Sequence, residues 1–436
     1  MGGHRALGRR SRAARAPRRR GAGGGAAARP HLDRQRAARG GAGGGIAREG
    51  HGRGRPLRPG LRGVSGTAAP PDAPLLLHVF PTFAVGGAQV RFCAVANRFG
   101  PRWRHAVVSL DGHADCAARL APEVPLELVP SPAAKGSGLK GIAQIAALLR
   151  RLRPATLVTS NWGSMDWVMA GLLVPGLRHV HTEDGFGPEE STGQKPRRVI
   201  ARRVLLRRST VVLPSETLLR SATDLWRLPP ARLHHIPNGL DIGRFRPDGP
   251  AALPPAPGEG PLVGTVAALR AEKNIALLIR AAAVLLREGT LLRLAVIGDG
   301  EERASLEALA RELGIEGSVL FAGAIPDPAS AYRALDVFAL SSTTEQMPFS
   351  ILEAMATGLP VASTDVGDVG VMLAPENRPH LVAATGTPEG MAAALRPLLL
   401  DAALRDRLGR ANRARAEARY DQETMFQAYA ALFDPR

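Results

Sequence analysis

The sequence predicts an α/β protein with two doubly wound, Rossmann-like domains that face each other across a cleft. Three observations lead to this fold class. Short runs with the character of buried strands alternate with helical patterns over residues 75–215, and the alternation starts again over residues 261–364. Such alternation is typical of parallel sheets covered by helices. The two series are separated by residues 234–261, which are rich in proline and glycine and have the composition of a linker between domains.

The individual elements follow from the spacing of apolar residues. In the first series we expect strands at residues 75–80, 106–110, 156–160, 179–183 and 211–215, with helices at 141–152 and 197–208. In the second series we expect strands at residues 261–269, 292–300, 318–323, 337–342 and 359–364, with helices at 274–289, 301–314, 328–336 and 348–357. In doubly wound domains, ligands bind at the carboxyl ends of the strands. We therefore expect the site in the cleft between the two domains.

The net charge of +18 is concentrated at the beginning of the chain. Residues 1–70 hold seventeen arginines and no lysine against Asp33 and Glu49, which leaves little net charge on the rest. We therefore expect no nucleic-acid partner, although a basic protein would ordinarily suggest one. Residues up to about Thr67 are nearly all Gly, Ala, Arg and Pro, which bury too little apolar surface to fold, so we expect disorder. A gene start assigned too far upstream would give the same composition, and we favour it over a nucleic-acid tail or a transit peptide.

The cysteines and the apolar runs bear on the compartment. Cys93 and Cys116 fit neither the spacing of a metal site nor a disulfide framework, so a reducing compartment is the simple inference. The longest apolar candidate for a membrane span, residues 167–177, is too short and contains a proline. We expect a cytoplasmic protein that is soluble or peripheral on the inner face of the membrane.

The segment EQMPFSILEAMATGLPV, residues 345–361, holds two carboxylates with seven residues between them. Pro348 suits the first turn of a helix and Gly358 suits its end. Glu345 then lies in the loop before the helix, and Glu353 projects from its second turn. Free backbone N–H groups at the helix start would favour a bound anion between the two carboxylates.

A plainer interpretation of this helix is also open. Ser350, Glu353 and Thr357 recur at helical spacing and could form a solvated stripe with no ligand.

Four motifs together resemble the family 4 retaining glycosyltransferases with the GT-B fold. They are AVGGAQ, IPNGLDIGRF, LAVIGDGEERASLE and the two glutamates of EQMPFSILEAMATGLPV. The resemblance extends from about Leu75 to Pro435. It implies a nucleotide-diphosphate sugar as donor, a glycan or lipid-linked acceptor, retention at the anomeric carbon, and no metal ion or other cofactor.

The resemblance also implies roles for particular residues. Glu353 would hold the ribose hydroxyls of the donor, and Glu345 would hold hydroxyls of the transferred sugar. The diphosphate would meet the backbone of a short segment, Met347, Pro348, Phe349 and Ser350. Carboxylates accept vicinal hydroxyls well, and a helix start favours phosphate, so elementary chemistry agrees with these roles.

Three further positions match the family pattern. Lys273 would neutralise the leaving diphosphate, Gly86 and Gly87 would let the backbone approach the donor, and His181 would face the reacting sugar. One position departs from it, because Ala268 stands where the family usually has an arginine. Arg270 lies nearby in the sequence and could reach the phosphates instead.

The resemblance assigns functions to the segments of the chain. We expect residues 1–70 to be disordered, residues 71–240 to bind the acceptor, residues 241–260 to form the hinge, and residues 261–405 to bind the nucleotide sugar. Helices in residues 406–436 are expected to pack back on the N-terminal domain.

Several of these features have simpler explanations. His181 could be a buried structural histidine. Residues 298–300 could be an ordinary strand-to-helix turn, and Asn238 and Gly239 could be turn residues. The basic run at residues 195–208 is better explained as a solvated face than as a membrane-binding helix, although a peripheral membrane contact stays open.

The sequence therefore indicates a metal-independent hexosyltransferase. The N-terminal half offers no clear counterpart of the nucleophilic carboxylate of retaining glycosidases. We therefore expect the acceptor hydroxyl to attack on the front face. A nucleotide-sugar epimerase of the same fold and a non-catalytic sugar-nucleotide binding protein are the alternatives. Donor consumption without an acceptor would indicate the first, and binding without turnover would indicate the second.

The composition of the first segment gives a prediction. Removal of residues 1–66 should leave folding, donor binding and activity unchanged, because the segment lacks core-forming residues. Thermal unfolding and donor binding of the shortened chain test this, and a loss of donor binding would contradict it.

Overall fold

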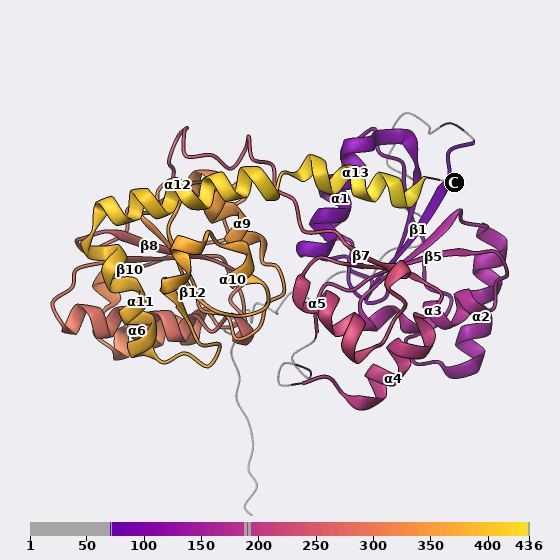
Figure 1. The fold of residues 1–436 in the computed structure, drawn as a ribbon, viewed down its shortest axis with the longest axis horizontal. Helices are drawn as coiled ribbons and strands as arrows, with labels where there is room; N and C mark the ends of the chain where they lie inside the picture. The colour runs from indigo at the N-terminus through magenta and orange to yellow at the C-terminus, as the bar shows by residue number, and fades with distance from the viewer. Residues whose placement is uncertain (1–69, 71, 187–189, 191–192, 435–436) are drawn as a thin grey trace, which may run out of the picture. The chain divides into compact units, whose positions relative to one another are not determined.

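Two parallel β-sheets covered by helices form the described part of the chain, which in this computed structural model comprises residues 70, 72–186, 190 and 193–434 (Figure 1). Apart from Pro70, the segment expected to be disordered lies outside the described residues. The first sheet has the strand order β3-β2-β1-β4-β5-β6-β7, and the second has the order β10-β9-β8-β11-β12-β13. All of these pairings are parallel, as the fold class requires.

The strands of the first sheet are β1 (Leu75–Phe80), β2 (Arg104–Ser109), β3 (Leu126–Leu128), β4 (Thr156–Ser160), β5 (Arg178–Thr182), β6 (Thr210–Leu213) and β7 (Leu233–His235). Those of the second are β8 (Leu262–Val266), β9 (Arg293–Ile297), β10 (Val319–Gly323), β11 (Val337–Leu340), β12 (Val361–Thr364) and β13 (Leu381–Val382). Most central strands are buried along their whole length, because helices cover both faces of a parallel sheet.

The helices that alternate with the first sheet are α1 (Gly87–Phe99), α2 (Gly138–Leu152), α3 (Met165–Leu172), α4 (Pro196–Leu205) and α5 (Glu216–Arg220). Those of the second series are α6 (Ile275–Arg287), α7 (Arg303–Glu312), α8 (Pro328–Tyr332), α9 (Phe349–Ala356), α10 (Val369–Met372) and α11 (Pro388–Leu400). The chain ends with α12 (Ala402–Arg419) and α13 (Gln422–Phe433).

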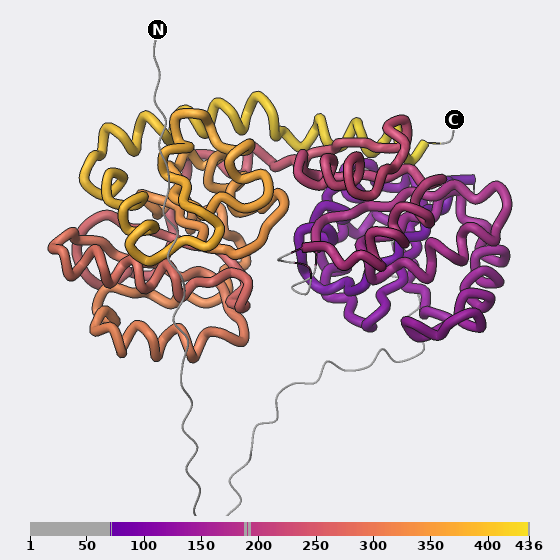
Figure 2. The backbone as a smooth tube through the Cα atoms, turned by 60° about the horizontal axis from the view of Figure 1, so that its bottom comes forward, coloured from indigo at the N-terminus to yellow at the C-terminus, as the bar shows by residue number. Residues whose placement is uncertain are grey.

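The two C-terminal helices pack on different sheets, which corrects part of the expectation for residues 406–436. Met425 and Phe426 of α13 share a hydrophobic cluster with Leu76 of β1. α13, the end of the yellow tube near the C label in Figure 2, contacts α1. In contrast, α12 packs against α9 and α11. Its buried Asn412 donates to the carbonyl oxygen of Leu359 at 2.9 Å, which holds α12 on the second sheet.

Three strands differ from the sequence-based expectation. β3 and β13 were not expected, because three and two residues are too few to give a periodic pattern. β7 includes His234 and His235, which we had placed in the linker because of the prolines that follow. The expected helix at 348–357 is α9, with Pro348 as its N-cap and Thr357 as its C-cap.

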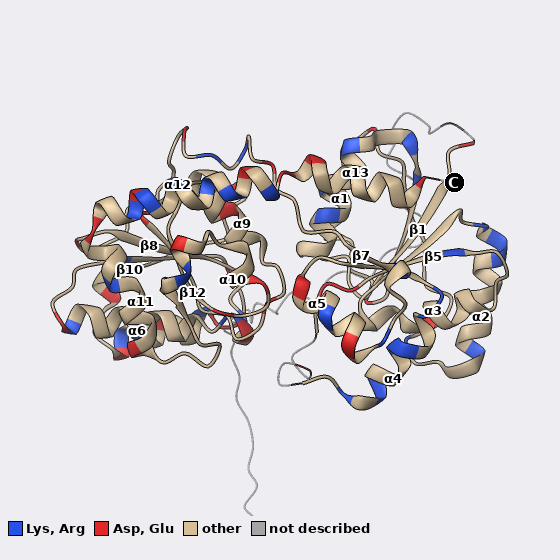
Figure 3. Cartoon of the chain, in the orientation of Figure 1, with Lys and Arg blue, Asp and Glu red and all other residues tan. Residues whose placement is uncertain are grey.

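The basic helix α4 exposes apolar residues and buries a charge. Ile200 and Val204 are exposed, whereas Arg202 is fully buried and binds Glu183 at 3.1 Å. Figure 3 shows the basic residues of α4 in blue. The Arg202 guanidinium also lies over the ring of Trp226, 5.0 Å from its centre. The simple solvated face that we favoured is therefore wrong for Arg202.

Cys93 and Cys116 are buried free thiols whose sulfur atoms lie 3.7 Å apart. Within the described residues, no helix is both long and apolar enough to cross a membrane.

The contact between α12 and the end of α9 gives a prediction. A Cβ atom added to Gly409 would lie 2.0 Å from the carbonyl oxygen of Gly358. Since this neighbour is backbone, Gly409→Ala should lower the free energy of unfolding by about 1–3 kcal/mol. Gly317→Ala is the control, because an added Cβ there meets nothing within 4 Å. Urea unfolding of both variants tests the contact, and equal effects would contradict it.

Candidate functional site

A cavity of about 460 Å³ lies where the chain leaves β1, β4, β8 and β11 at their carboxyl ends. In the first sheet the strand order reverses between β1 and β4, and in the second between β8 and β11. Ligands of open parallel sheets bind at such points. Nine of the predicted site residues line this cavity: Gly86, Gly87, Arg270, Lys273, Glu345, Met347, Pro348, Phe349 and Ser350. Ala268, the position that departs from the family pattern, lines it as well.

Two helices begin at this cavity. α1 starts at Gly87, with Gly86 as its N-cap, and α9 starts at Phe349. A Cβ atom on Gly87 would lie 3.3 Å from the Phe349 ring, so glycine allows these two helix starts to approach closely. The first N–H groups of a helix lack partners within it and carry partial positive charge. The arrangement favours an anion such as a phosphate group.

Lys273 and Glu345 form an ion pair that faces the cavity. The Lys273 ammonium lies 2.6 Å from Glu345 Oε1, and both side chains are mostly buried. The Ser342 hydroxyl donates to the same carboxylate oxygen at 2.8 Å, while the Ser341 hydroxyl donates to the Lys273 carbonyl oxygen at 3.1 Å. The loop after β11 therefore holds both members of the pair in place.

Glu353 lies in a neighbouring cavity of about 540 Å³. Val266, Ala267, Ala268 and Phe349 line both cavities, so the two are adjacent. The Tyr332 hydroxyl donates to Glu353 Oε2 at 2.8 Å. Burial raises the pKa of Glu353 to about 7, although the hydrogen bond from Tyr332 opposes the shift.

The solvated-stripe interpretation does not fit this environment. Thr357 is buried, and its hydroxyl donates to the carbonyl oxygen of Glu353 at 2.8 Å. Ser350 lines the first cavity and Glu353 the second, so the three residues share no exposed face.

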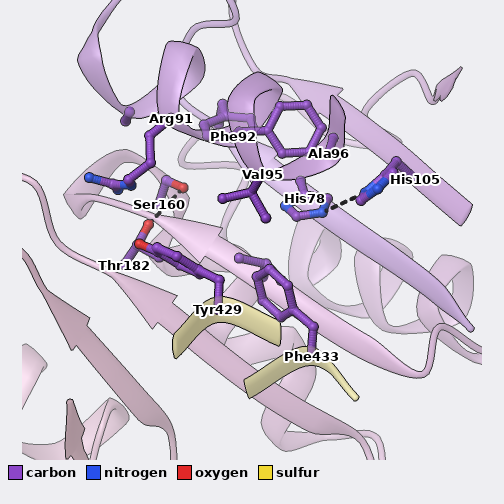
Figure 4. A pocket seen from close by; sticks show the side chains of 13 residues that line it. His78, Arg91, Phe92, Val95, Ala96, His105, Ser160, Thr182, Tyr429 and Phe433 are labelled. Atoms are coloured by element: carbon purple, nitrogen blue, oxygen red, sulfur yellow. Dashed lines mark hydrogen bonds between the residues drawn. The ribbon is translucent and has the colours of Figure 1, made fainter. Parts of the chain in front are cut away.

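A second ion pair at the first cavity was not predicted. Arg91 of α1 binds Asp184 at 2.6 Å and donates to Asn238 Oδ1 at 2.8 Å. Its guanidinium lies 5.9 Å from the centre of the Tyr429 ring, and Figure 4 shows these two side chains in an adjoining pocket of the first domain. Asn238 in turn donates to the carbonyl oxygen of Met347 at 2.9 Å. Asn238 is therefore more than a turn residue, because it connects Arg91 to the segment before α9.

Asp184 is a carboxylate of the N-terminal half that lines the first cavity and that we did not predict. Its Oδ2 atom is buried and has no hydrogen-bond partner within the described residues. The backbone N–H of Asp184 donates to Asn161 Oδ1 at 2.7 Å, and Asn161 lines the same cavity. The position of Asp184, just after strand β5, was the sequence signal that could have identified it.

The structure does not bring His181 to this cavity. His181 is fully buried in β5, and its Nδ1 lies 2.8 Å from the Thr159 hydroxyl. Its Nε2 lies 3.6 Å from Glu183, the carboxylate that binds Arg202. This placement agrees with the alternative of a buried structural histidine.

Ala268 and Arg270 are both exposed, and both line the first cavity. Arg270 therefore supplies a positive charge in the part of the cavity where Ala268 supplies none. Within the described residues, no group of three His, Cys, Asp or Glu side chains is placed to hold a metal ion.

Comparison with protein families gives two matches in chain order. Residues 85–244 match the model described as Glycosyltransferase Family 4, and residues 253–415 match the model described as Glycosyl transferases group 1. Together they cover most of the residues that line both cavities, apart from Gln422 and Met425 of α13.

Individual relatives agree with these matches. The chain is 36% identical over 177 residues to the lipopolysaccharide core biosynthesis glycosyltransferase LpsE of Rhizobium meliloti, an alignment that covers 40% of this chain and 50% of LpsE. It is 31% identical over 288 residues to the D-inositol 3-phosphate glycosyltransferase of Kineococcus radiotolerans, covering 58% of this chain and 65% of that one. The chain thus spans about half to two-thirds of the length of these curated relatives.

A solved structure resembles the fold. HepE from Anabaena, crystallised with UDP and glucose, superposes with a TM-score of 0.68 at 19% identity, over 82% of this chain and 99% of HepE. The two matched models, the two sheets and the cavity at their carboxyl ends together lead to one conclusion: the chain belongs to the family 4 glycosyltransferases with the GT-B fold.

Proposed function

We propose that the protein transfers a hexose from a nucleotide-diphosphate sugar to a hydroxyl group of a glycan or lipid-linked acceptor, with retention and without a metal ion. The observation that carries this proposal is the pair of adjacent cavities, one with Lys273, Glu345 and two helix starts, the other with Glu353. A nucleotide sugar has a nucleoside at one end, a charged diphosphate in the middle and a sugar at the other end. Glu353, the helix starts with Lys273, and Glu345 would match these three parts in turn.

The diphosphate is proposed to bind at the starts of α1 and α9. Lys273 and Arg270 supply positive charge there, and the N–H groups of Phe349 and Ser350 supply donors. Binding would draw the Lys273 ammonium from Glu345 toward the phosphates. The Glu345 carboxylate would then be free to accept hydroxyl groups of the transferred sugar.

The nucleoside is proposed to occupy the second cavity. Glu353 would accept hydrogen bonds from two ribose hydroxyls there. These would join the hydrogen bond that its Oε2 already accepts from the Tyr332 hydroxyl. The domain assignment follows from this placement: residues 261–405 would hold the donor, and residues 71–240 would hold the acceptor. LpsE is named for lipopolysaccharide core biosynthesis, which supports a surface glycan as the acceptor class.

The reaction is proposed to proceed on one face of the sugar. The bond between the anomeric carbon and the phosphate oxygen breaks, and the acceptor oxygen bonds to the same carbon from the same side. The departing diphosphate takes the acceptor proton. Asp184 is held by Arg91, and a paired carboxylate is a poor nucleophile, so front-face attack stays the preferred path. Positioning and charge stabilisation would supply most of the acceleration.

The membrane contact is a separate and weaker part of the proposal. Ile200 and Val204 are exposed on α4, and Arg197, Arg207 and Arg208 near them are exposed cations. This face would suit a peripheral approach to an anionic membrane that carries a lipid-linked acceptor.

A thermal-shift panel of nucleotide sugars tests the proposal as a whole. A ligand that binds only the native state raises the melting temperature, so a donor should do so. Incubation of that donor with and without acceptor glycans then separates the alternatives. Consumption without acceptor would indicate the epimerase, and binding without turnover under every condition would indicate a non-catalytic binding protein.

Lys273→Ala should lower turnover more than donor affinity. The positive charge meets negative charge that grows as the phosphate leaves, so the loss falls mainly on the transition state. We expect turnover to fall by about 10²-fold or more. Steady-state kinetics measure both effects, with Lys140→Ala as control because Lys140 is exposed on α2. A variant with unchanged turnover and weakened donor binding would reduce Lys273 to a binding role.

The two glutamates should respond differently to substitution. Glu353→Ala should weaken nucleoside diphosphate binding by at least about tenfold, because one hydrogen bond to a charged group contributes about 1.5–3 kcal/mol. Glu345→Ala should leave this binding nearly unchanged, since it releases Lys273, but it should reduce sugar transfer. Calorimetric titration with UDP, ADP and GDP measures the first effect, and transfer assays measure the second.

Glu353→Gln serves as the matched control for charge. With a pKa of about 7, Glu353 of the wild-type protein is largely protonated at pH 6 and ionised at pH 8. Ribose hydroxyls bind the ionised form more strongly, so nucleotide affinity should rise over this range. The diphosphate also gains charge there, and only the part of the rise that disappears in Glu353→Gln belongs to Glu353. If Glu353→Ala binds like wild type, the assignment of the ribose site is wrong.

A further inference from the structure

A further cavity, of about 510 Å³ and separate from the two described above, lies at the edge of the first sheet opposite to the proposed active site. Its lining comes from the amino ends of four neighbouring strands. Thr156 begins β4, Arg178 begins β5, Thr210 begins β6 and His234 lies in β7. Parallel strands place their amino ends at one edge and their carboxyl ends at the other, so this cavity is separate from the nucleotide site.

The cavity is positively charged. Arg208 and Arg232 line it from two different segments, and both side chains are exposed. Neither has an acidic partner among the described residues, and none of the described lining residues is an aspartate or glutamate. Two unneutralised guanidinium groups in one cavity repel each other, and a bound anion would remove that cost.

A buried hydroxyl in the same cavity also lacks a partner. Thr156 is fully buried, and its Oγ1 atom has no hydrogen-bond partner among the described residues. Buried hydroxyls are usually hydrogen-bonded, because an unpaired one has lost its contact with water. Because its Oγ1 exposes almost no surface to the cavity, this hydroxyl forms no contact with a ligand, and the two arginines carry the recognition.

We propose that this cavity binds a phosphomonoester, either a soluble metabolite or the headgroup of a phospholipid. The planar guanidinium of arginine matches phosphate oxygens in pairs. A phosphomonoester has three terminal oxygens, enough for contacts with both arginines. The volume falls in the usual range for small-molecule sites, about 300–1,000 Å³, and leaves room for the group that the phosphate carries.

Calorimetric titration with glycerol phosphate tests the site. The double variant Arg270→Ala, Lys273→Ala is used as the background, because it removes two of the cations that line the carboxyl-end cavity. In that background, Arg208→Ala and Arg232→Ala should each weaken binding at least about tenfold. Arg207→Ala is the matched control, since it removes the same charge from the neighbouring exposed position outside the cavity. It should change affinity by less than about twofold.

Thr156→Val is a second control. The substitution removes a buried hydroxyl without a partner, so the melting temperature of the free protein should rise by about 1–3 °C. Binding of glycerol phosphate should stay unchanged, because this hydroxyl does not reach the cavity. A loss of affinity as large as that of Arg208→Ala would contradict recognition by the arginines.

Vesicle binding distinguishes the two sources of phosphate. Retention on vesicles of phosphatidic acid, but not of phosphatidylcholine, that is lost in Arg232→Ala would support a headgroup. Binding of glycerol phosphate alone would support a soluble metabolite. The proposal is overturned if no phosphate probe binds, or if Arg207→Ala weakens binding as much as Arg208→Ala.

Discussion

The direction of the strands is the constraint on which the rest of the structure depends. Because every strand pairing of both sheets is parallel, the loops that leave β1, β4, β8 and β11 all emerge at carboxyl edges. Glycines, a lysine and a glutamate that are far apart in the sequence therefore line one cavity. The same geometry gathers strand beginnings at another edge, where no acidic residue of the described lining balances the arginines. Strand direction thus places the proposed nucleotide site and the arginine-lined cavity at opposite edges of the first sheet.

Much of the fold and part of the site could be predicted from local patterns. Runs such as Thr156–Ser160 contain β-branched and apolar residues that suit a buried strand, and β4 has these bounds. The carboxylates Glu345 and Glu353 could be placed relative to one helix, because Pro348 and Gly358 fix its ends. Their separation into two adjacent cavities depends on Phe349, which lies between them in the sequence and lines both.

The misses have a common physical reason, which is that a side chain's surroundings depend on contacts distant in the sequence. His181 lies within β5, where side chains alternate between the faces of the sheet, whereas Asp184 lies beyond the strand end and reaches the cavity. Arg91 sits among apolar residues of α1, so its pairing with Asp184 could not be read from the helix. β7 was not predicted, because prolines follow it in the sequence and its pairing with β6 is a tertiary contact that the local sequence does not show.

The packing of α13 has a consequence for biosynthesis. Met425, Phe426 and Tyr429 complete the cluster that also contains Leu76, although these residues come from opposite ends of the chain. The ribosome makes Leu76 long before α13, so this cluster stays incomplete until residues 422–433 have emerged. The second sheet can complete its core earlier, when Tyr420 has emerged. Although its strands are synthesised first, the first sheet is therefore completed after the second, and its nascent form exposes apolar surface that chaperones bind.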